Sequence, residues 1–214
     1  NGFSFYSVGS GTVLENLVSY KGADDGFEFY GGTVSAKNLI SYGNSDDSFD
    51  WQDGWQGQAN TNWYAYQVGT GNFGMEIESK SVNNAFFPKV SNITLRRAAG
   101  TVTEAGNPTE IDEKKKKKEG NGEYSNIVIS GYAANAAIAR IQDANTNTNQ
   151  VNGGKIKLLN VKIADSTPLT GAGSSSFTVS FPVGNFTTST TSTGAALTPG
   201  AWAIVDGVNL LANL

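Results

Sequence analysis

The sequence predicts an all-β protein, a right-handed parallel β-helix with about 22 residues in each coil. The first observation is a repeat: Asn16–Tyr20 returns as Asn38–Tyr42, and Asp24–Phe29 returns as Asp46–Trp51, each 22 positions later. The second is that apolar and polar residues alternate inside these blocks, as they do in strands. Most two-helix repeats are longer, and the spacing of leucine-rich repeats is absent. The architecture that remains is a solenoid in which each coil contributes short parallel strands that stack on those of the next coil.

The stacking predicts which side chains face inward. Coils of a parallel stack lie about 4.8 Å apart, so equivalent residues form columns along the axis. The asparagine that opens each block is expected to form a ladder of side-chain amides at a turn. These asparagines are Asn16, Asn38, Asn62, Asn92, Asn126 and Asn160. The two inward columns are Leu17, Leu39, Trp63, Ile93, Ile127 and Val161, then Ser19, Ser41, Ala65, Leu95, Ile129 and Ile163.

The chain divides by composition into coils and a C-terminal segment. Residues 1–173 are expected to form the coils, with 97–123 as a loop insertion. The run Lys114–Lys118 lies in that insertion, and a solvated loop or binding of an acidic glycan would explain it. Residues 174–214 are expected to be an irregular cap over the open end. Because a strand-like pattern is already under way at Asn1, we expect earlier coils and a targeting segment to be missing.

Composition excludes several classes of chemistry. The chain has no Cys and no His, which removes thiol catalysis, Ser-His-Asp triads and His-ligated metals. The formal net charge is -4, so nucleic acid and anionic membranes are not expected partners. No run of about 20 apolar residues is present, so no transmembrane segment is expected. A Cys-free chain fits an extracytoplasmic location: secreted, periplasmic or on the outer surface. The oligomeric state is not predicted.

The second repeated block places carboxylates on one face. If Phe27 and Phe29 point inward, Glu28 points outward, and the same phase puts Asp50 and Glu76 outward on the next two coils. Stacked like charges destabilise the fold unless something neutralises them, and a calcium ion suits flexible carboxylates. The alternative is turn chemistry for the aspartate pairs that precede the strands, and solvent-facing charges that guard the strand surface for Glu28, Asp50 and Glu76. The candidate metal ligands are Asp24, Asp25, Asp46, Asp47 and Asp50, and the candidate catalytic residues are Glu28, Asp50 and Glu76.

A second outward column is aromatic. Tyr20, Tyr42 and Tyr66 occupy equivalent positions at the end of the first repeated block. Stacked exposed tyrosines form a strip on which a sugar ring can lie, so these three are candidate ligand-binding residues. Stacking that stabilises the sheet, or cover by a loop, is the other explanation. An inverted phase would bury them.

The repeated acidic motif resembles a group of secreted right-handed parallel β-helix proteins of Gram-negative bacteria, surface or lipoprotein-like and mostly uncharacterised. The resemblance rests on Asp24–Phe29, Gly31–Val34 and Ala36–Lys37 and runs through about residues 10–100. It implies the fold and an exported location, and almost nothing about activity.

The same motif is similar, locally, to that of the calcium-dependent β-helical pectate lyases, whose carboxylates on neighbouring coils hold calcium against an acidic polysaccharide. Those enzymes also need a Lys base on a following coil, in a context that Gly71–Ile77 resembles, and Glu76 stands where that Lys would be. Lys80 and Lys89 are the remaining candidates for a base. The matching carboxylates are Asp46, Asp47 and Asp50, with Asp24 or Asp25.

Three functions remain, in this order. The first is an exported β-helix without assigned activity that binds glycans or serves as a structural module. The second is a polysaccharide-active enzyme, either a calcium-dependent lyase or a carboxylate-based glycoside hydrolase. The third is an adhesin-like spacer. Enzymatic activity is thus left open, with a protein that is not an enzyme as the favoured interpretation and polysaccharide as the expected partner.

Overall fold

A computed structural model describes residues 1–69, 71–78, 88–99, 109–111, 121–165, 170–173 and 177–214. Most of its strands belong to two seven-stranded sheets. Sheet A contains, in spatial order, β1 (Phe3–Tyr6), β3 (Phe27–Tyr30), β5 (Phe49–Gln52), β7 (Met75–Ile77), β9 (Thr109–Ile111), β11 (Ala137–Ile141) and β13 (Thr170–Gly173). Sheet B contains β14 (Phe186–Thr188), β12 (Ile156–Ile163), β10 (Gly122–Ser130), β8 (Lys89–Arg97), β6 (Asn60–Gln67), β4 (Ala36–Tyr42) and β2 (Leu14–Tyr20).

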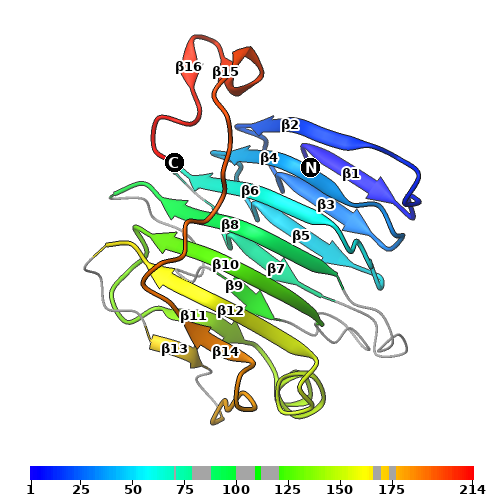
Figure 1. Ribbon diagram of the computed structural model, residues 1–214, viewed down its shortest axis with the longest axis vertical. Coiled ribbons are helices and arrows are strands. Elements are labelled where there is room, and N and C mark those ends of the chain that lie inside the picture. Colours follow the sequence, from blue (N-terminus) through cyan, green and yellow to red (C-terminus); the bar gives the residue numbers. More distant parts are fainter. Residues whose placement is uncertain (70, 79–87, 100–108, 112–120, 166–169, 174–176) are drawn as a thin grey trace.

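The chain alternates between the two sheets, so each strand pairs with the strand two further along (Figure 1). Every pairing within the two large sheets is parallel. We call one strand of sheet A with the following strand of sheet B a repeat. The predicted all-β architecture with parallel strands is therefore confirmed.

The register of sheet B confirms both predicted inward columns. Leu17 pairs with Leu39 and Leu39 with Trp63, and the column continues through Ile93 and Ile127 to Val161. In sheet A, Phe27 stacks on Phe49 with ring centroids 5.8 Å apart. The inner sides of the two sheets share one hydrophobic cluster, and its removal from water is the main favourable term in folding.

The predicted asparagine ladder is confirmed in part: amide-to-amide bonds join three pairs of neighbours, while Asn92 bonds to Thr61 Oγ1 instead of Asn62. The six asparagines have φ between 53° and 59°, the left-handed conformation that Asn tolerates better than other side chains. The Asn38 amide donates to the Asn16 carbonyl at 2.9 Å, and the Asn62 amide donates to the Asn38 carbonyl at 3.1 Å. Asn126 donates to Asn92 in the same way at 2.7 Å. Each asparagine thus bends its strand and most also tie adjacent repeats together.

Residues 97–123 are not a simple loop insertion. Thr109–Ile111 forms β9, which pairs with β7 and β11 in the middle of sheet A. The reason is visible in the residues, because Ile111 continues the buried column of Trp51 and Ile77. The run Lys114–Lys118 lies outside the described residues.

A short helical segment interrupts the repeats after β11. It consists of the single turn α1 (Ala144–Thr146) and the π-helical turn η1 (Asn147–Val151). The Asp143 carboxylate caps it by accepting from the backbone N–H of Asn145 and Thr146, as an N-cap side chain does. No helix among the described residues has the length and apolar composition needed to cross a membrane.

The C-terminal segment does two things. Phe177, Val179 and Phe181 pack against the core, and β14 adds a strand to the edge of sheet B. The chain then runs back across the outer side of sheet B to the β2 end, where it forms η2 (Ala201–Ala203), β15 (Ile204–Val205) and β16 (Val208–Asn209) (Figure 1). The tail is therefore more than a cap over an open end. The division into residues 1–173 and 174–214 stays a prediction.

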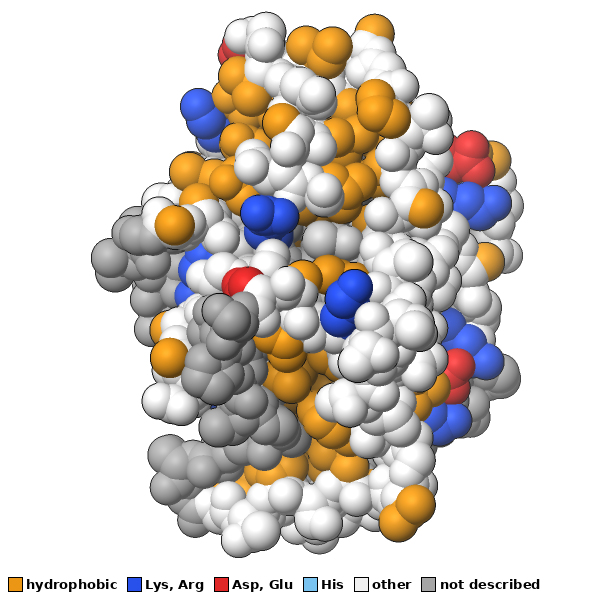
Figure 2. Space-filling view, turned by 60° about the vertical axis from the view of Figure 1, so that its left-hand side comes forward, with side chains coloured by type: hydrophobic (Ala, Val, Ile, Leu, Met, Phe, Trp, Pro, Cys, Tyr) orange, Lys and Arg blue, Asp and Glu red, His pale blue; other side chains and the backbone are white. Residues whose placement is uncertain are grey.

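This return path covers apolar side chains that would otherwise face water. Ile40 and Tyr64, on the outer side of sheet B, are fully buried against Leu197, Ala203 and Leu210. The backbone N–H of Ala195 donates to Thr94 Oγ1 at 3.0 Å, which holds the segment to the sheet. On the face seen in Figure 2, hydrophobic and neutral polar side chains dominate among the described residues.

We predict that Asn38→Ala lowers the free energy of unfolding by about 2–4 kcal/mol, measured by urea denaturation. The variant loses two ladder hydrogen bonds and forces a Cβ-bearing residue without a polar side chain into the left-handed region. Asn38→Gly is the matched control, because it keeps the backbone conformation and loses only the ladder. Equal costs for the two variants would contradict the role assigned to the left-handed bend.

Candidate functional site

The outward column of sheet A is acidic, as predicted. Glu28 pairs with Asp50, and Asp50 pairs with Glu76. The register extends the column to Ser4 on one side and Glu110 on the other. The three predicted carboxylates are buried, with exposed fractions of 4% to 5%. These side chains therefore point away from the hydrophobic core and yet are not exposed to solvent.

The connections that lead into sheet A bring two more carboxylates to this column. The Asp25 carboxylate accepts a hydrogen bond from the Asp47 backbone N–H at 3.0 Å. The Asp47 carboxylate accepts one from the Phe73 backbone N–H at 2.6 Å. Each aspartate therefore ties its connection to that of the next repeat, because the N–H group that it accepts lies 22 or 26 residues further along the chain rather than in its own turn.

The oxygens of these side chains gather into two overlapping groups. Carboxylate oxygens of Asp25, Glu28 and Asp50 lie within 4.8 Å of one another, and all three residues are buried. Oxygens of Asp24, Asp25 and Asp46 form a second group with the same spacing. We call these the inner and outer carboxylate groups. Asp25 belongs to both, and the half-exposed side chain of Asp24 places the outer group at the surface.

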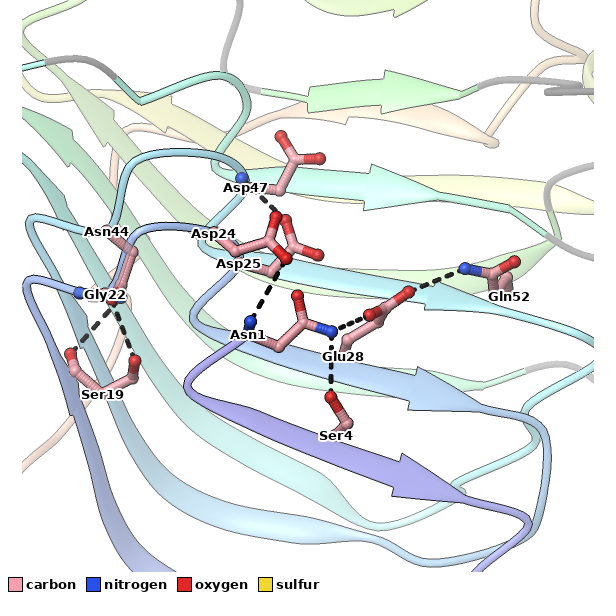
Figure 3. Close-up of polar contacts among 10 residues, drawn as sticks. All are labelled: Asn1, Ser4, Ser19, Gly22, Asp24, Asp25, Glu28, Asn44, Asp47 and Gln52. Atoms are coloured by element: carbon pink, nitrogen blue, oxygen red, sulfur yellow. Dashed lines mark hydrogen bonds and ion pairs between the residues drawn. The ribbon is translucent and has the colours of Figure 1, made fainter.

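Neutral donors surround Glu28. The Gln52 amide donates to one carboxylate oxygen at 2.7 Å, and the Asn1 amide donates to the other. Asn1 also donates to the Ser4 hydroxyl, and its ammonium group lies 3.2 Å from Asp24 (Figure 3). Both Glu28 oxygens are thereby satisfied, and the side chain is fixed toward the inner group.

Asp50 differs from Glu28. Its Oδ1 atom is buried and has no hydrogen-bond partner, although the side chain sits among other carboxylates. A buried carboxylate oxygen without a partner costs folding free energy unless a proton or a cation satisfies it. This atom is the strongest single sign of an unmet ligand in the site.

The pKa shifts of the aspartates also indicate that the site needs a neutralising ligand. Burial, reinforced by neighbouring carboxylates, raises the pKa of Asp25 to about 7. Burial also raises the pKa of Asp47 and of Asp50, and the charge of Glu76 adds to both shifts. No described Lys or Arg forms an ion pair with these three aspartates. The site can therefore bind protons or a cation near neutral pH, because either one relieves the same repulsion.

The three predicted tyrosines lie elsewhere. Tyr20, Tyr42 and Tyr66 form the expected outward column on sheet B, with ring centroids 5.5 Å and 5.0 Å apart. All three are only partly exposed because the C-terminal segment packs against them. This geometry favours the packing explanation, and a sugar-binding role stays a prediction.

Sequence reasoning missed several residues of the acidic face. Gln52 binds Glu28, and Glu78 is buried and raises the pKa of Asp50. The alternation of polar and apolar residues in Glu76-Ile77-Glu78 could have indicated that Glu78 lies on the same face as Glu76. Nothing comparable singled out Gln52, whose role depends on the repeat before it. Of the two candidate lysine bases, Lys80 lies outside the described residues, and Lys89 is paired in register with Glu123 on sheet B.

Comparison with known proteins supports the architecture. A family model described as "Pectate-lyase like beta helix domain" matches residues 1–204. No curated protein and no solved structure gives a significant match. The family assignment therefore rests on nearly the whole chain, while no individual relative indicates a specific activity.

We predict that, in EDTA, the free energy of unfolding falls as pH rises from about 4 to about 7, by on the order of 2–4 kcal/mol. The pKa of Asp25 is about 7 in the fold and 3.8 without it, so the native state binds more protons than the unfolded chain in this window. Its stabilising contribution is complete below the unfolded pKa and is lost as pH passes through the folded one. Urea denaturation across this range measures the slope.

Asp25→Asn should flatten this dependence, because the amide oxygen still accepts the Asp47 N–H but carries no charge. Asp53→Asn is the matched control, since Asp53 is exposed and is a member of neither carboxylate group. A stability that rises with pH in the parent protein would contradict the electrostatic picture.

Proposed function

Because the chain belongs to the pectate-lyase-like β-helix family, we propose that it is an extracytoplasmic right-handed parallel β-helix that binds polysaccharide through a calcium ion held on sheet A. The observation that carries the proposal is the Asp50 Oδ1 atom, buried without a partner beside Asp25 and Glu28.

The donor set fits calcium. The site offers only oxygen ligands, several of them carboxylates, and calcium accepts many such oxygens in flexible geometry. Magnesium needs a stricter octahedron, and zinc or copper would favour the His and Cys that the chain lacks. Asp25, Glu28 and Asp50 would hold an ion at the inner group, and its charge would offset their mutual repulsion.

The outer carboxylate group connects this ion to a glycan. Asp24 and Asp46 share Asp25 with the inner group and are less buried than the inner carboxylates. A cation at the outer group has coordination positions facing solvent, and the carboxylate of an acidic sugar can fill them. Acidic polysaccharides are therefore the class we assign as ligand.

A second function has one specific observation in its favour. Glu28 and Asp50 occupy adjacent repeats, and only Asp50 is left without donors while burial raises its pKa. A carboxyl group with a raised pKa beside a second carboxyl group is the kind of pair that retaining glycoside hydrolases use. A lyase is less well supported, because Glu76 stands in register where a Lys base would be needed.

We predict that saturating calcium raises the melting temperature by about 5–10 °C at pH 7, relative to EDTA. Asp50→Asn should remove most of this rise, because it withdraws the unpartnered carboxylate from the inner group. Asp53→Asn, which removes an exposed carboxylate, should leave the rise unchanged. Differential scanning calorimetry measures all three, and a parent protein indifferent to calcium would rule out the cation site.

Activity assays separate the two functions. We expect calcium to strengthen the binding of oligogalacturonate measured by isothermal titration calorimetry, with no unsaturated product absorbing in the ultraviolet. New reducing ends that disappear in both Glu28→Gln and Asp50→Asn would favour the hydrolase instead. Release of unsaturated product would show that a lyase mechanism operates despite Glu76.

A further inference from the structure

A cavity of about 450 Å³ lies where the sheet B strands β8 and β10 end. Its wall combines two arginines with a hydroxyl, a phenol and one carboxylate. The residues that matter for its chemistry are Arg96, Arg97, Ser130, Gly131, Tyr132 and Asp165. This volume is within the range of small-ligand pockets in proteins.

Arg97 is an unusual member of this wall. Its side chain is only 5% exposed, and it donates through Nη2 to the Gln67 side-chain oxygen at 3.3 Å and to the Asn72 carbonyl at 3.2 Å. The guanidinium also lies 4.4 Å from the centre of the Tyr132 ring. Its Nε–H is buried and has no acceptor. Burial lowers the pKa of Arg97, because the charged form of the guanidinium loses its hydration there.

No described carboxylate pairs with these arginines, whereas two lysines of sheet B do have carboxylate partners. Lys37 pairs with Glu15 at 3.6 Å, and Lys157 pairs with Glu123 at 3.1 Å. No carboxylate of the described residues lies within ion-pair distance of Arg96 or Arg97. The Asp165 carboxylate lines the same cavity, but it accepts the Gly131 backbone N–H at 2.6 Å instead.

The turn at Gly131 keeps this arrangement rigid. Gly131 has φ of 80°, and a Cβ there would lie 2.0 Å from the Arg97 carbonyl oxygen. Only glycine allows the two repeats to approach so closely. Tyr132 is thereby held over Arg97, and its hydroxyl donates to the same Gln67 oxygen at 2.8 Å. The buried cation is thus positioned before any ligand arrives.

We propose that this cavity is an oxyanion-binding site, and that its ligand is a carboxylate or sulfate group, an acidic sugar being the class that fits the rest of the molecule. Arg96 makes the direct ion pair, because it is the more exposed of the two arginines. Arg97 supplies positive charge from the buried part of the cavity wall, and the Ser130 hydroxyl is a further hydrogen-bond donor. The planar guanidinium group suits two-point contact with such an anion.

The position of the cavity fits an extended ligand. The acidic connections precede β3 and β5, and the cavity follows β8 and β10, so both lie on connections from sheet B to sheet A. Successive repeats are spaced by about 4.8 Å. One acidic chain along this edge would meet carboxylates with their cation first and arginines afterwards. The cavity itself needs no metal, so its binding is independent of the calcium site.

The test is isothermal titration calorimetry in EDTA at low salt. The probes are oligogalacturonate, a sulfated oligosaccharide, inorganic sulfate and a neutral cello-oligosaccharide. We expect saturable binding of the anionic probes only, weakened about tenfold in Arg96→Gln and at raised ionic strength. Lys37→Gln is the matched control, since it removes one positive charge from a different part of sheet B and should leave binding unchanged.

Arg97→Lys tests the buried charge, with its folding checked first by circular dichroism. It keeps a cation but loses the planar donors, so weaker binding in a folded protein supports the proposal. Binding of inorganic sulfate without the sugars would identify a free anion as the ligand of the same site. The proposal is overturned if no anionic probe binds, or if Arg96→Gln and Lys37→Gln weaken binding equally. Loss of calcium binding alone would leave this result untouched.

Discussion

In-register stacking of parallel strands is the constraint on which the rest of this structure depends. Each residue lies beside its equivalent in the next repeat, about 4.8 Å away. A side-chain type that recurs at one position therefore forms a continuous column along the stack. Phenylalanine on phenylalanine extends a buried core, as Phe27 and Phe49 do. The left-handed asparagines and their amide ladder hold this register. A slip of one residue would turn Asp50 into the core and Phe49 out of it.

The same constraint creates the acidic site. Carboxylates on successive repeats cannot move apart, because the backbone that carries them is hydrogen-bonded in register. The carboxylates of Asp25 and Asp47 each accept a hydrogen bond from the backbone of the next repeat, so they link repeats as well as being candidate cation ligands. Asp50 has no such bond and remains the point at which a proton or cation is most needed. The stability of the fold and the proposed cation binding therefore depend on the same group of side chains.

The C-terminal segment determines which outer surfaces are open. Its return across sheet B buries Ile40 and Tyr64 and half-covers the tyrosine column. The acidic column lies on the other sheet, and the arginine cavity lies at the ends of the sheet B strands. Both sites thus occupy parts of the molecule that this segment does not need for its own packing.

The sequence by itself determined the repeat and hence the parallel pairing, both inward columns, the asparagine ladder and the acidic column. It could do so because each of these repeats a local pattern at a constant spacing, so one period predicts a neighbour. It did not reveal β9, whose three residues follow a long irregular stretch, or the partnership of Gln52 with Glu28. Only the tertiary structure decided that Glu28, Asp50 and Glu76 are buried and that the tail packs against Tyr20, Tyr42 and Tyr66. The same holds for Arg97, which has no carboxylate partner among the described residues. Those outcomes depend on contacts between segments far apart in the chain, and no repeating pattern encodes them.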